Sequence, residues 1–284
     1  MNDLLTPKQV ANAIAVSESS VKRWCDKGSI PTKYTAGGHR RIALPGLLQF
    51  LREQNYEIAR PELLGLPSNT GRSVRVIERA SEALVTALTE GHEEETRRIL
   101  IDLYLAEHSL GAICDQVIAP AFEKIGNLWE CGSAEVFQER QGCEFTLRVL
   151  HELGTLIESP PSGAPKAIGA APAGDQYNLA TTMAELVLRD AGWNATSLGD
   201  NLPLATLGEA IKKHRPRVFW LSCSHLHDVG SFLDEYTRLH DEFGLSVAFV
   251  VGGRALSEEL RQKMKYAAFC DNMQHLQGFV QSLA

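Results

Sequence analysis

Residues 166–284 alternate short apolar runs with amphipathic segments, a pattern that few folds accommodate. Buried strands that alternate with helices form an open parallel sheet covered on both faces, so we expect a doubly wound α/β domain of flavodoxin-like or Rossmann-like type. The runs predict strands at 167–171, 194–198, 218–222, 246–251 and 267–269, and helices at 179–191, 204–214, 229–243 and from 257 onward.

Ligands of such sheets bind beyond the carboxyl ends of the strands. The strand-to-helix loops expected at that edge are 172–178, 199–202, 223–228 and 252–254.

The chain has 284 residues, more than one ordinary domain needs. Apolar residues recur at helical spacing from 74 to 159, with breaks near Gly91, 107–109 and 132–133, which predicts four helices in an up-and-down bundle. Proline-rich and glycine-rich stretches at 54–73 and 160–165 predict linkers. The expected division is therefore 1–53, linker 54–73, 74–159, linker 160–165 and 166–284.

The first 53 residues predict a winged helix-turn-helix. Thr6 and Pro7 are a helix-start signal, and Ser17 caps a second helix that stops at Gly28, where positive φ is allowed. Residues 33–42 predict two short strands joined by a glycine turn, and Leu44 opens a helix that ends near 53.

The net charge of −7 is unevenly spread. Residues 1–53 hold eight basic and four acidic residues, a balance of +4, so the remaining 231 residues carry −11. A small basic module on an acidic body is the arrangement expected when one end contacts a polyanion. The alternative is a solvated helical hairpin with an ordinary charged surface. The candidate DNA contacts are Ser19, Ser20, Lys22, Arg23, Lys33, Tyr34, Gly37, Gly38, His39, Arg40 and Arg41.

Other signals exclude several classes of protein. The N-terminus has no secretion signal and no run approaches 18 apolar residues, so we expect a cytoplasmic protein with no membrane partner. The six cysteines form no Cys-x-x-Cys pair, which is typical of buried thiols in a reducing compartment. No nucleophile-elbow, phosphate-loop or zinc-hydrolase motif is present, and a non-enzymatic function is expected.

Residues 4–53 resemble the winged helix-turn-helix of the MerR family of transcription regulators, on Trp24, the segment 28–31 and the segment 35–42, which contains Gly-Gly-His-Arg-Arg. This resemblance implies binding to double-stranded operator DNA by a homodimer or homotetramer. It places the second helix in the groove, with Arg40 and Arg41 on the DNA backbone.

The remainder is similar to the cap and binding domains of cobalamin-dependent regulators, in particular light-responsive carotenoid-gene repressors that use adenosylcobalamin. In that family a Trp, nine residues and Glu-His cover the upper face of the corrin. Trp129 and Glu139 match, and Arg140 replaces the histidine. Without the resemblance, the helical spacing of Trp129 favours a core position.

The lower-face motif of that family is Asp-x-His-x-x-Gly, in which the Asp orients a cobalt-ligating imidazole. Here it reads Asp175, Tyr177 and Ala180. A phenol is a poor cobalt ligand compared with neutral imidazole, so cobalt ligation through this loop is not expected. Ser222 and Ser224 match the serine element of the nucleotide-tail channel, and Gly252 with Gly253 matches the pair that leaves room for the tail. Each is also common at strand ends of doubly wound folds.

Several alternatives stay open. In the first alternative, residues 74–284 bind cobalamin without a lower histidine ligand. In the second they bind another tetrapyrrole, and in the third they bind no ligand and serve as a scaffold for a partner protein. His225 and His227 share one face of an extended segment and are weak metal candidates, with surface histidines as the simpler interpretation. We expect a DNA-binding transcription regulator, as a repressor, whose body senses a ligand or light or mediates oligomerisation. A corrinoid carrier or methyltransferase module is the less favoured reading.

Overall fold

The computed structural model describes residues 4–35, 37–54, 56, 58–65, 74–131 and 135–283. These residues form two compact units, one of 1–109 with 116–157 and one of 110–115 with 158–284. The five-part division expected from the sequence is finer than this and stays a prediction. No helix in the described part of the chain is long and apolar enough to span a membrane.

The N-terminal module begins with β1 (Leu4–Leu5), α1 (Pro7–Ala13) and α2 (Glu18–Asp26). Thr6 caps α1 through a reciprocal pair of hydrogen bonds with Gln9, and Ser17 caps α2 by accepting from the Ser20 amide. After α2 the chain turns at Gly28, whose φ of 75° is one that a side chain disfavours. The predicted helix-turn-helix is confirmed.

The wing consists of β2 (Thr32–Tyr34) and β3 (Arg40–Ala43), which pair antiparallel, and α3 (Leu44–Glu53) follows. Strand β1 pairs with the free side of β3 and makes a three-stranded sheet, which the sequence analysis did not predict because two residues carry no alternation signal. Trp24 of α2 packs against both Phe50 of α3 and Tyr56, with ring centroids 5.0 and 5.2 Å away, and the Phe50 and Tyr56 rings lie 6.2 Å from each other.

The segment 58–65, within the predicted linker, has ordered structure of its own. A short 3₁₀ helix (Pro61–Leu64) follows Arg60, whose backbone amide and Nε donate to the carbonyls of Ala13 and Asn12. These bonds attach the segment to the end of α1. Residues 66–73 of the predicted linker lie outside the described residues.

Four helical runs follow, as expected: α4 (Val74–Glu90), α5 (Glu93–Leu105), a run of α6 (Leu110–Ile113), a π segment (Cys114–Ile118) and α7 (Ala119–Glu130), and α8 (Val136–Leu156). Leu84, Leu88, Leu100 and Leu150 are fully buried among them. A two-pronged ion pair from Arg97 of α5 to Glu152 of α8, at 2.6 and 2.8 Å, fixes those two helices side by side.

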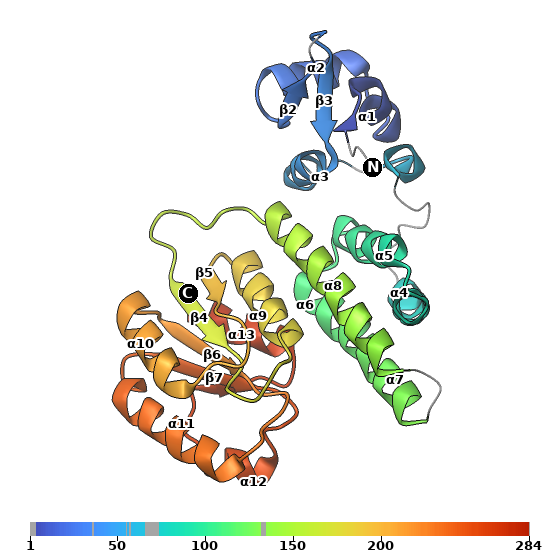
Figure 1. Cartoon of the computed structure of the whole chain (residues 1–284). Helices are drawn as coiled ribbons and strands as arrows, with labels where there is room; N and C mark the ends of the chain where they lie inside the picture. The colour runs from blue at the N-terminus through green and yellow to red at the C-terminus, as the bar shows by residue number, and fades with distance from the viewer. Residues whose placement is uncertain are drawn as a thin grey trace. The chain divides into compact units, whose positions relative to one another are not determined.

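The C-terminal unit contains a five-stranded parallel sheet in the order β5-β4-β6-β7-β8 (Figure 1). Its strands are β4 (Lys166–Ala170), β5 (Asn194–Ser197), β6 (Val218–Ser222), β7 (Ala248–Gly252) and β8 (Ala268–Phe269). This is the flavodoxin-like order: the chain adds β5 on one side of β4 and then adds β6, β7 and β8 on the other side, so the strand order reverses between β4 and β6. The predicted doubly wound sheet is confirmed.

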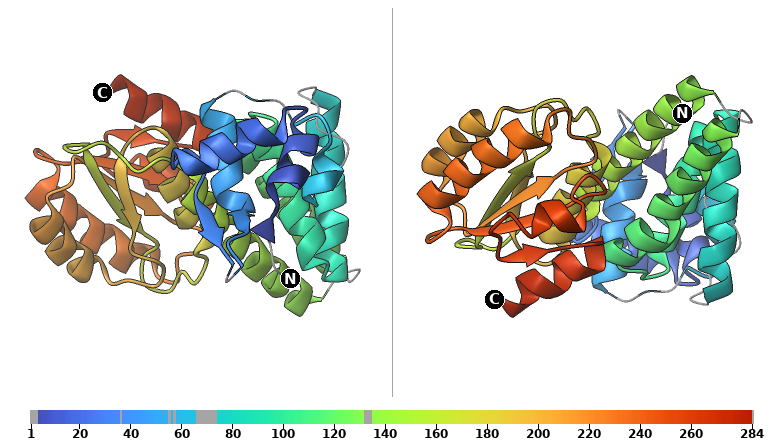
Figure 2. Two further views of the ribbon diagram at one scale, coloured as in Figure 1. Left: turned by 90° about the horizontal axis from the view of Figure 1, so that it is seen from above. Right: turned by 90° about the horizontal axis from the view of Figure 1, so that it is seen from below.

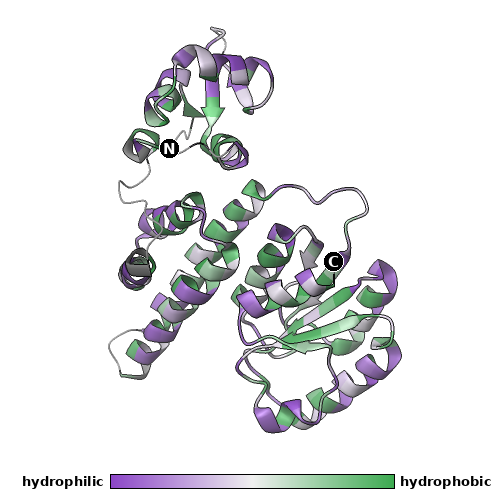
Figure 3. Cartoon of the chain, turned by 180° about the vertical axis from the view of Figure 1, so that it is seen from behind, coloured by the Kyte–Doolittle hydropathy of each residue, from purple (hydrophilic) through white to green (hydrophobic). Residues whose placement is uncertain are grey.

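Helices cover both faces of this sheet (Figure 2). On one face α10 (Leu204–His214) and α11 (Val229–Phe243) enclose Phe219, Leu221 and Phe249. On the other, α9 (Leu179–Asp190) and α13 (Met273–Ser282) enclose Trp193, Trp220 and Val250. Figure 3 shows the consequence, with hydrophobic strands at the centre and hydrophilic outer helix faces.

Two details of the C-terminal unit differ from expectation. The helix expected from 257 is only one turn, α12 (Glu258–Arg261). Helix α13 was not expected, although Asn272 caps it and Leu276 and Val280 bury one of its faces. Its two buried positions are too few to stand out as a helical pattern in ten residues.

Candidate functional site

Helix α2 presents a polar, cationic surface. Ser19, Lys22 and Arg23 are exposed, while Val21 and Cys25 of the same helix are buried in the core of the module. Lys22 pairs with Glu18 at 2.8 Å, one turn away, and this hydrogen bond lowers the pKa of the Glu18 carboxyl. Ser19 and Ser20 each hydrogen-bond the hydroxyl of Ser17 at 2.8 Å, so these hydroxyls are held at the N-terminus of the helix.

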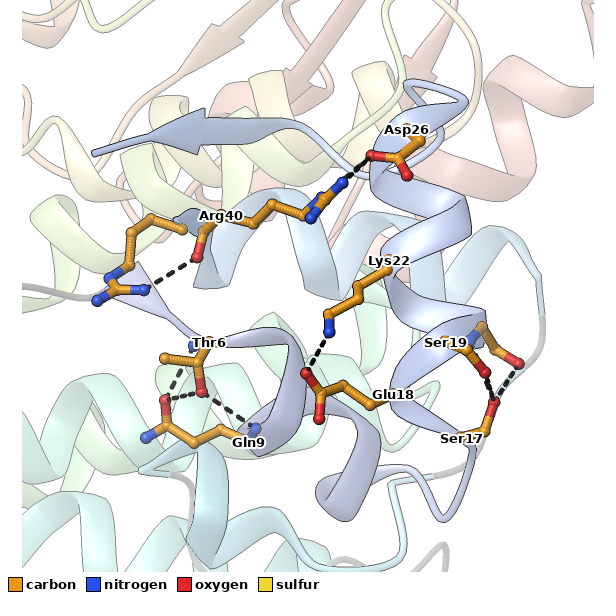
Figure 4. Close-up of polar contacts among 10 residues, drawn as sticks. Thr6, Gln9, Ser17, Glu18, Ser19, Lys22, Asp26 and Arg40 are labelled. Atoms are coloured by element: carbon orange, nitrogen blue, oxygen red, sulfur yellow. Dashed lines mark hydrogen bonds and ion pairs between the residues drawn. The ribbon is translucent and has the colours of Figure 1, made fainter. Parts of the chain in front are cut away.

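The wing is tied to α2 by one ion pair. Arg40 donates from Nε and Nη2 to Oδ1 of Asp26, at 3.0 and 2.8 Å (Figure 4). The Arg40 guanidinium lies 5.9 Å from the ring centre of Tyr34. The hydrogen bond to Asp26 raises the pKa of Arg40, and Arg41 donates to the Arg40 carbonyl. Asp26 was missed by the sequence analysis, because it lies 14 residues from Arg40 and no local pattern joins them.

The other predicted wing residues form the tip and outer edge of the hairpin. Lys33, Tyr34, Gly37, Gly38 and His39 are exposed there, and Arg41 is half-buried beside them. Thr35 holds the turn by accepting from the amides of Gly38 and His39 through its carbonyl and hydroxyl oxygens. Ala36 lies outside the described residues. The structure therefore brings the predicted DNA-contact residues onto two neighbouring elements, α2 and the wing.

In the C-terminal unit, the loops after β4 and β6 flank the point where the strand order reverses, the place at which open α/β sheets bind ligands. Asp175 bridges them. Its carboxylate is fully buried and accepts from three backbone amides, Tyr177 at 3.0 Å through Oδ1, and Ser224 at 2.5 Å and His225 at 3.1 Å through Oδ2. Both oxygens are thus used within the protein.

The loops after β5 and β7 join the same cluster. The side-chain oxygen of Asn201 accepts from the Gly174 backbone amide at 2.8 Å, and the Asn201 backbone amide donates to the Asp175 carbonyl. Arg254 donates to the Ser224 carbonyl at 3.3 Å and lies 5.7 Å from the ring centre of Tyr177. Neither Asn201 nor Arg254 was predicted, since each follows a strand without belonging to a recognised motif.

This geometry does not fit a cobalt centre ligated from below. The residue at the ligand position is a phenol, and Asp175, which would orient an imidazole there, already accepts three backbone hydrogen bonds. Gly252 and Gly253 are also required by the packing of the protein's own backbone. A Cβ at Gly253, whose φ is 108°, would overlap the Cys223 carbonyl, and one at Gly252 would lie 2.8 Å from the Cys270 carbonyl oxygen.

His225 and His227 are both exposed at the end of β6. Among the described residues no group of three or more His, Cys, Asp or Glu side chains is arranged to hold a metal ion. The two histidines therefore stay weak candidates.

Trp129 is not a core residue, contrary to the expectation from its spacing. It is 48% exposed at the end of α7, and Leu128 beside it and Val136 and Phe137 at the start of α8 are also exposed. Glu139 is half-buried and Arg140 is exposed in the first turns of α8. The predicted upper-face residues Trp129, Glu139 and Arg140 thus lie near the end of α7 and the start of α8, where several apolar side chains are exposed.

Two family models match the chain: a helix-turn-helix domain over residues 4–55 and a B12 binding domain over residues 80–153. The HTH-type transcriptional repressor CarH of Myxococcus xanthus is 28% identical over 170 residues, 60% of this chain and 56% of that protein. The HTH-type transcriptional repressor CarA of the same organism is 22% identical over 265 residues, 89% of this chain and 88% of that protein. The chain therefore spans about half the length of CarH and most of CarA.

The structure of the Methanosarcina barkeri monomethylamine corrinoid protein superimposes with a TM-score of 0.61 at 16% identity, covering 74% of this chain and 99% of that chain. This likeness shows a shared fold. The comparisons confirm the predicted combination of a helix-turn-helix domain with a cobalamin-type module and the predicted resemblance to repressors of transcription.

Proposed function

We propose that this protein is a DNA-binding regulator of transcription, acting as a repressor, in which residues 4–53 bind double-stranded operator DNA and the cobalamin-type body regulates that binding. The observation that carries the proposal is the exposed face of α2 with Ser19, Lys22 and Arg23, held beside a basic wing by the Asp26–Arg40 ion pair. Hydroxyl and cationic side chains on a helix of this size suit contacts with base edges and phosphates in a major groove. The similarity to two repressors supports it.

The site favours a regulator over a corrinoid carrier. A carrier needs no basic helix-turn-helix, and Tyr177 stands where the lower cobalt ligand of such proteins is expected. Regulation requires that a bound ligand, a partner protein or the absorption of light favour one state of the protein over another. A homodimer and a homotetramer would be two such states. Both are even-numbered assemblies, which match operators with two-fold symmetry.

Selection from a random double-stranded DNA library with the full-length protein tests DNA recognition directly. We expect a recovered palindromic or direct-repeat motif, and an affinity that falls steeply with salt concentration. Recovery of no enriched sequence would contradict the proposal. A reporter carrying the motif between promoter and gene then measures the expected repression.

Arg23 and Arg40 separate two kinds of DNA contact. We expect Arg40→Ala to weaken binding to all duplex sequences by a similar factor and to lower the slope of log K against log salt by about 1. Arg23→Ala on α2 is expected to weaken the selected motif more than random DNA. The matched control is Arg238→Ala on α11, an exposed arginine of the C-terminal unit that should leave both affinities unchanged. An unaltered salt slope in Arg40→Ala would count against phosphate contact by the wing.

A further inference from the structure

Trp220 lies in the middle of the sheet face covered by α9 and α13. Strand pairing aligns it with Gly169 of β4 on one side and Val250 of β7 on the other. Beyond Gly169 the row continues to Ser197 of β5. Trp220 is therefore the one large side chain of this row, next to a position that has no side chain at all.

The indole occupies the space above Gly169. A Cβ added at Gly169 would overlap the Cγ, Cδ2 and Cε2 atoms of the Trp220 ring, so the ring lies flat on the bare backbone of β4. Its Nε1 donates to Thr181 Oγ1 of α9 at 2.9 Å, and Thr181 is in turn 3.1 Å from the Ser197 hydroxyl. Trp220 is only 3% exposed. The indole ring is thus closely packed, and its one polar atom, Nε1, has a hydrogen-bond acceptor.

Trp220 and Ser222 lie two residues apart on the same strand, β6. Residues two apart on a strand share a face, so Ser222 lies one step, about 6.6 Å, toward the carboxyl edge from Trp220. Gly252, paired with Ser222 in β7, lies in the same outer row and is closed by the Cys270 carbonyl. These are the residues that the sequence analysis assigned to a nucleotide-tail channel.

We propose that the Trp220 side chain fills the space that a nucleotide base would need in this channel, and that the α/β domain therefore packs fully without a corrinoid tail and has no room for one. An indole and a benzimidazole are both fused rings of six and five members, so the side chain matches the base of cobalamin in size and shape. Closely packed interiors have no room for two such groups in one place. The polar chain through Thr181 and Ser197 satisfies the one donor that the indole brings.

The wild-type protein tests this proposal without any substitution. Adenosylcobinamide carries the same corrin and upper ligand as adenosylcobalamin but lacks the nucleotide tail. In calorimetric titrations in the dark, we expect dissociation constants for the two that agree within about tenfold, or no heat from either. Adenosylcobalamin binding more than about tenfold tighter than adenosylcobinamide would overturn the proposal, because the tail would then contribute to affinity.

Substitution tests the size of the occupied space. We expect Trp220→Ala to lower Tm by on the order of 10 °C and to create an apolar cavity that millimolar indole or benzimidazole fills, restoring several degrees. Trp193→Ala is the matched control, since Trp193 is a 2% exposed tryptophan of the same cluster that packs at the turn before β5. Rescue of Trp193→Ala to the same extent, or no rescue of folded Trp220→Ala, would contradict the proposal.

Should Trp220→Ala fail to fold, Trp220→Leu leaves a smaller cavity and the same comparison applies. These outcomes are independent of the proposed DNA binding. A protein that binds its selected motif yet discriminates strongly for the corrinoid tail would refute only the inference about Trp220, and the reverse result would refute only the proposed function.

Discussion

Asp175 illustrates how one buried charge can organise a whole edge of a sheet. Its two oxygens accept from three amides on two loops, and no part of its surface is exposed. A buried carboxylate is costly unless its lone pairs are used, and here backbone amides use them. Its position in the sequence matches a ligand-orienting motif, but the side chain holds the loops after β4 and β6 together.

Replacing this carboxylate should therefore cost stability. We expect Asp175→Asn to lower the free energy of unfolding by about 3 kcal/mol, because the amide nitrogen offers a donor where backbone amides need an acceptor. Urea unfolding followed by tryptophan fluorescence measures the change. Asp234→Asn, at an exposed position on α11, is the control and should change little. Equal effects of the two substitutions would contradict the organising role of Asp175.

Asp102 of α5 is a second unusual carboxyl. Burial, reinforced by the nearby charge of Glu95, raises its pKa to about 7, and its Oδ1 has no hydrogen-bond partner among the described residues. In the unfolded chain the pKa is about 3.9. Below about pH 4 the group is neutral in both states, and between about pH 4 and 7 only the unfolded state ionises. Stability is therefore present at low pH and is lost as the pH rises toward 7.

We expect Asp102→Asn to remove this loss. The wild-type protein should lose about 1–2 kcal/mol between pH 4 and 7 from this group, a figure reduced from the full linkage because the carboxyl is partly solvated. Denaturant unfolding at a series of pH values compares the wild type with Asp102→Asn. Glu94→Gln, at an exposed position on the same helix, should keep the wild-type slope. A pH dependence that persists in Asp102→Asn would be evidence against this assignment.

The observed bounds of helices and strands agree best with those expected from the sequence where the signals that begin and end an element are strong. The expected bounds of α10, β6 and α11 agree with the structure to the residue, since Pro203 and Asp228 precede the two helices and Arg215 in left-handed geometry ends α10. Helix α13 was missed because its stabilisation is tertiary. Asp115, far away in sequence, accepts from the amides of Met273 and Gln274 at 2.8 and 2.9 Å.

The candidate sites divide in the same way. The candidate DNA-contact residues of α2 and the wing could be predicted from the sequence, because helix caps and turns close to them in the chain determine their positions. The partners Asp26, Asn201 and Arg254 could not, because each contacts residues brought together only by the fold. For Trp129 the helical spacing alone favoured a core position, whereas the resemblance assigned it to a ligand; the side chain is 48% exposed, because spacing does not distinguish a buried face from an accessible one at the end of a helix.

Asp115 is expected to hold α13 in place. Its carboxylate lies at the N-terminus of that helix, where free amides and the helix dipole favour a negative charge. We expect Asp115→Ala to increase amide exchange at Leu276 and Val280 by about tenfold while leaving the strands protected. Glu123→Ala, at an exposed position on α7, provides the comparison. Unchanged exchange in α13 would show that Asn272 and the apolar face suffice.

Charge divides the whole chain in two, with +4 on the first 53 residues and −11 on the rest. An acidic body repels DNA, so binding to duplexes depends on a small surface that must be correctly presented. This separation lets the body change without altering the surface that contacts DNA. We therefore expect the cobalamin-type module to regulate the proposed repressor by changing how residues 4–53 are presented to DNA.

The two compact units should also unfold separately. The apolar clusters described on the two faces of the sheet are formed by residues between 167 and 283, so the sheet has a core of its own. Units with separate cores give separate transitions in calorimetry when the contacts between them are weak. We expect two transitions, with Asp175→Asn lowering the midpoint of one and Asp102→Asn raising that of the other at pH 8. The exposed substitutions Asp234→Asn and Glu94→Gln should move neither. A single transition shifted by both Asp175→Asn and Asp102→Asn would show that the chain folds as one cooperative body.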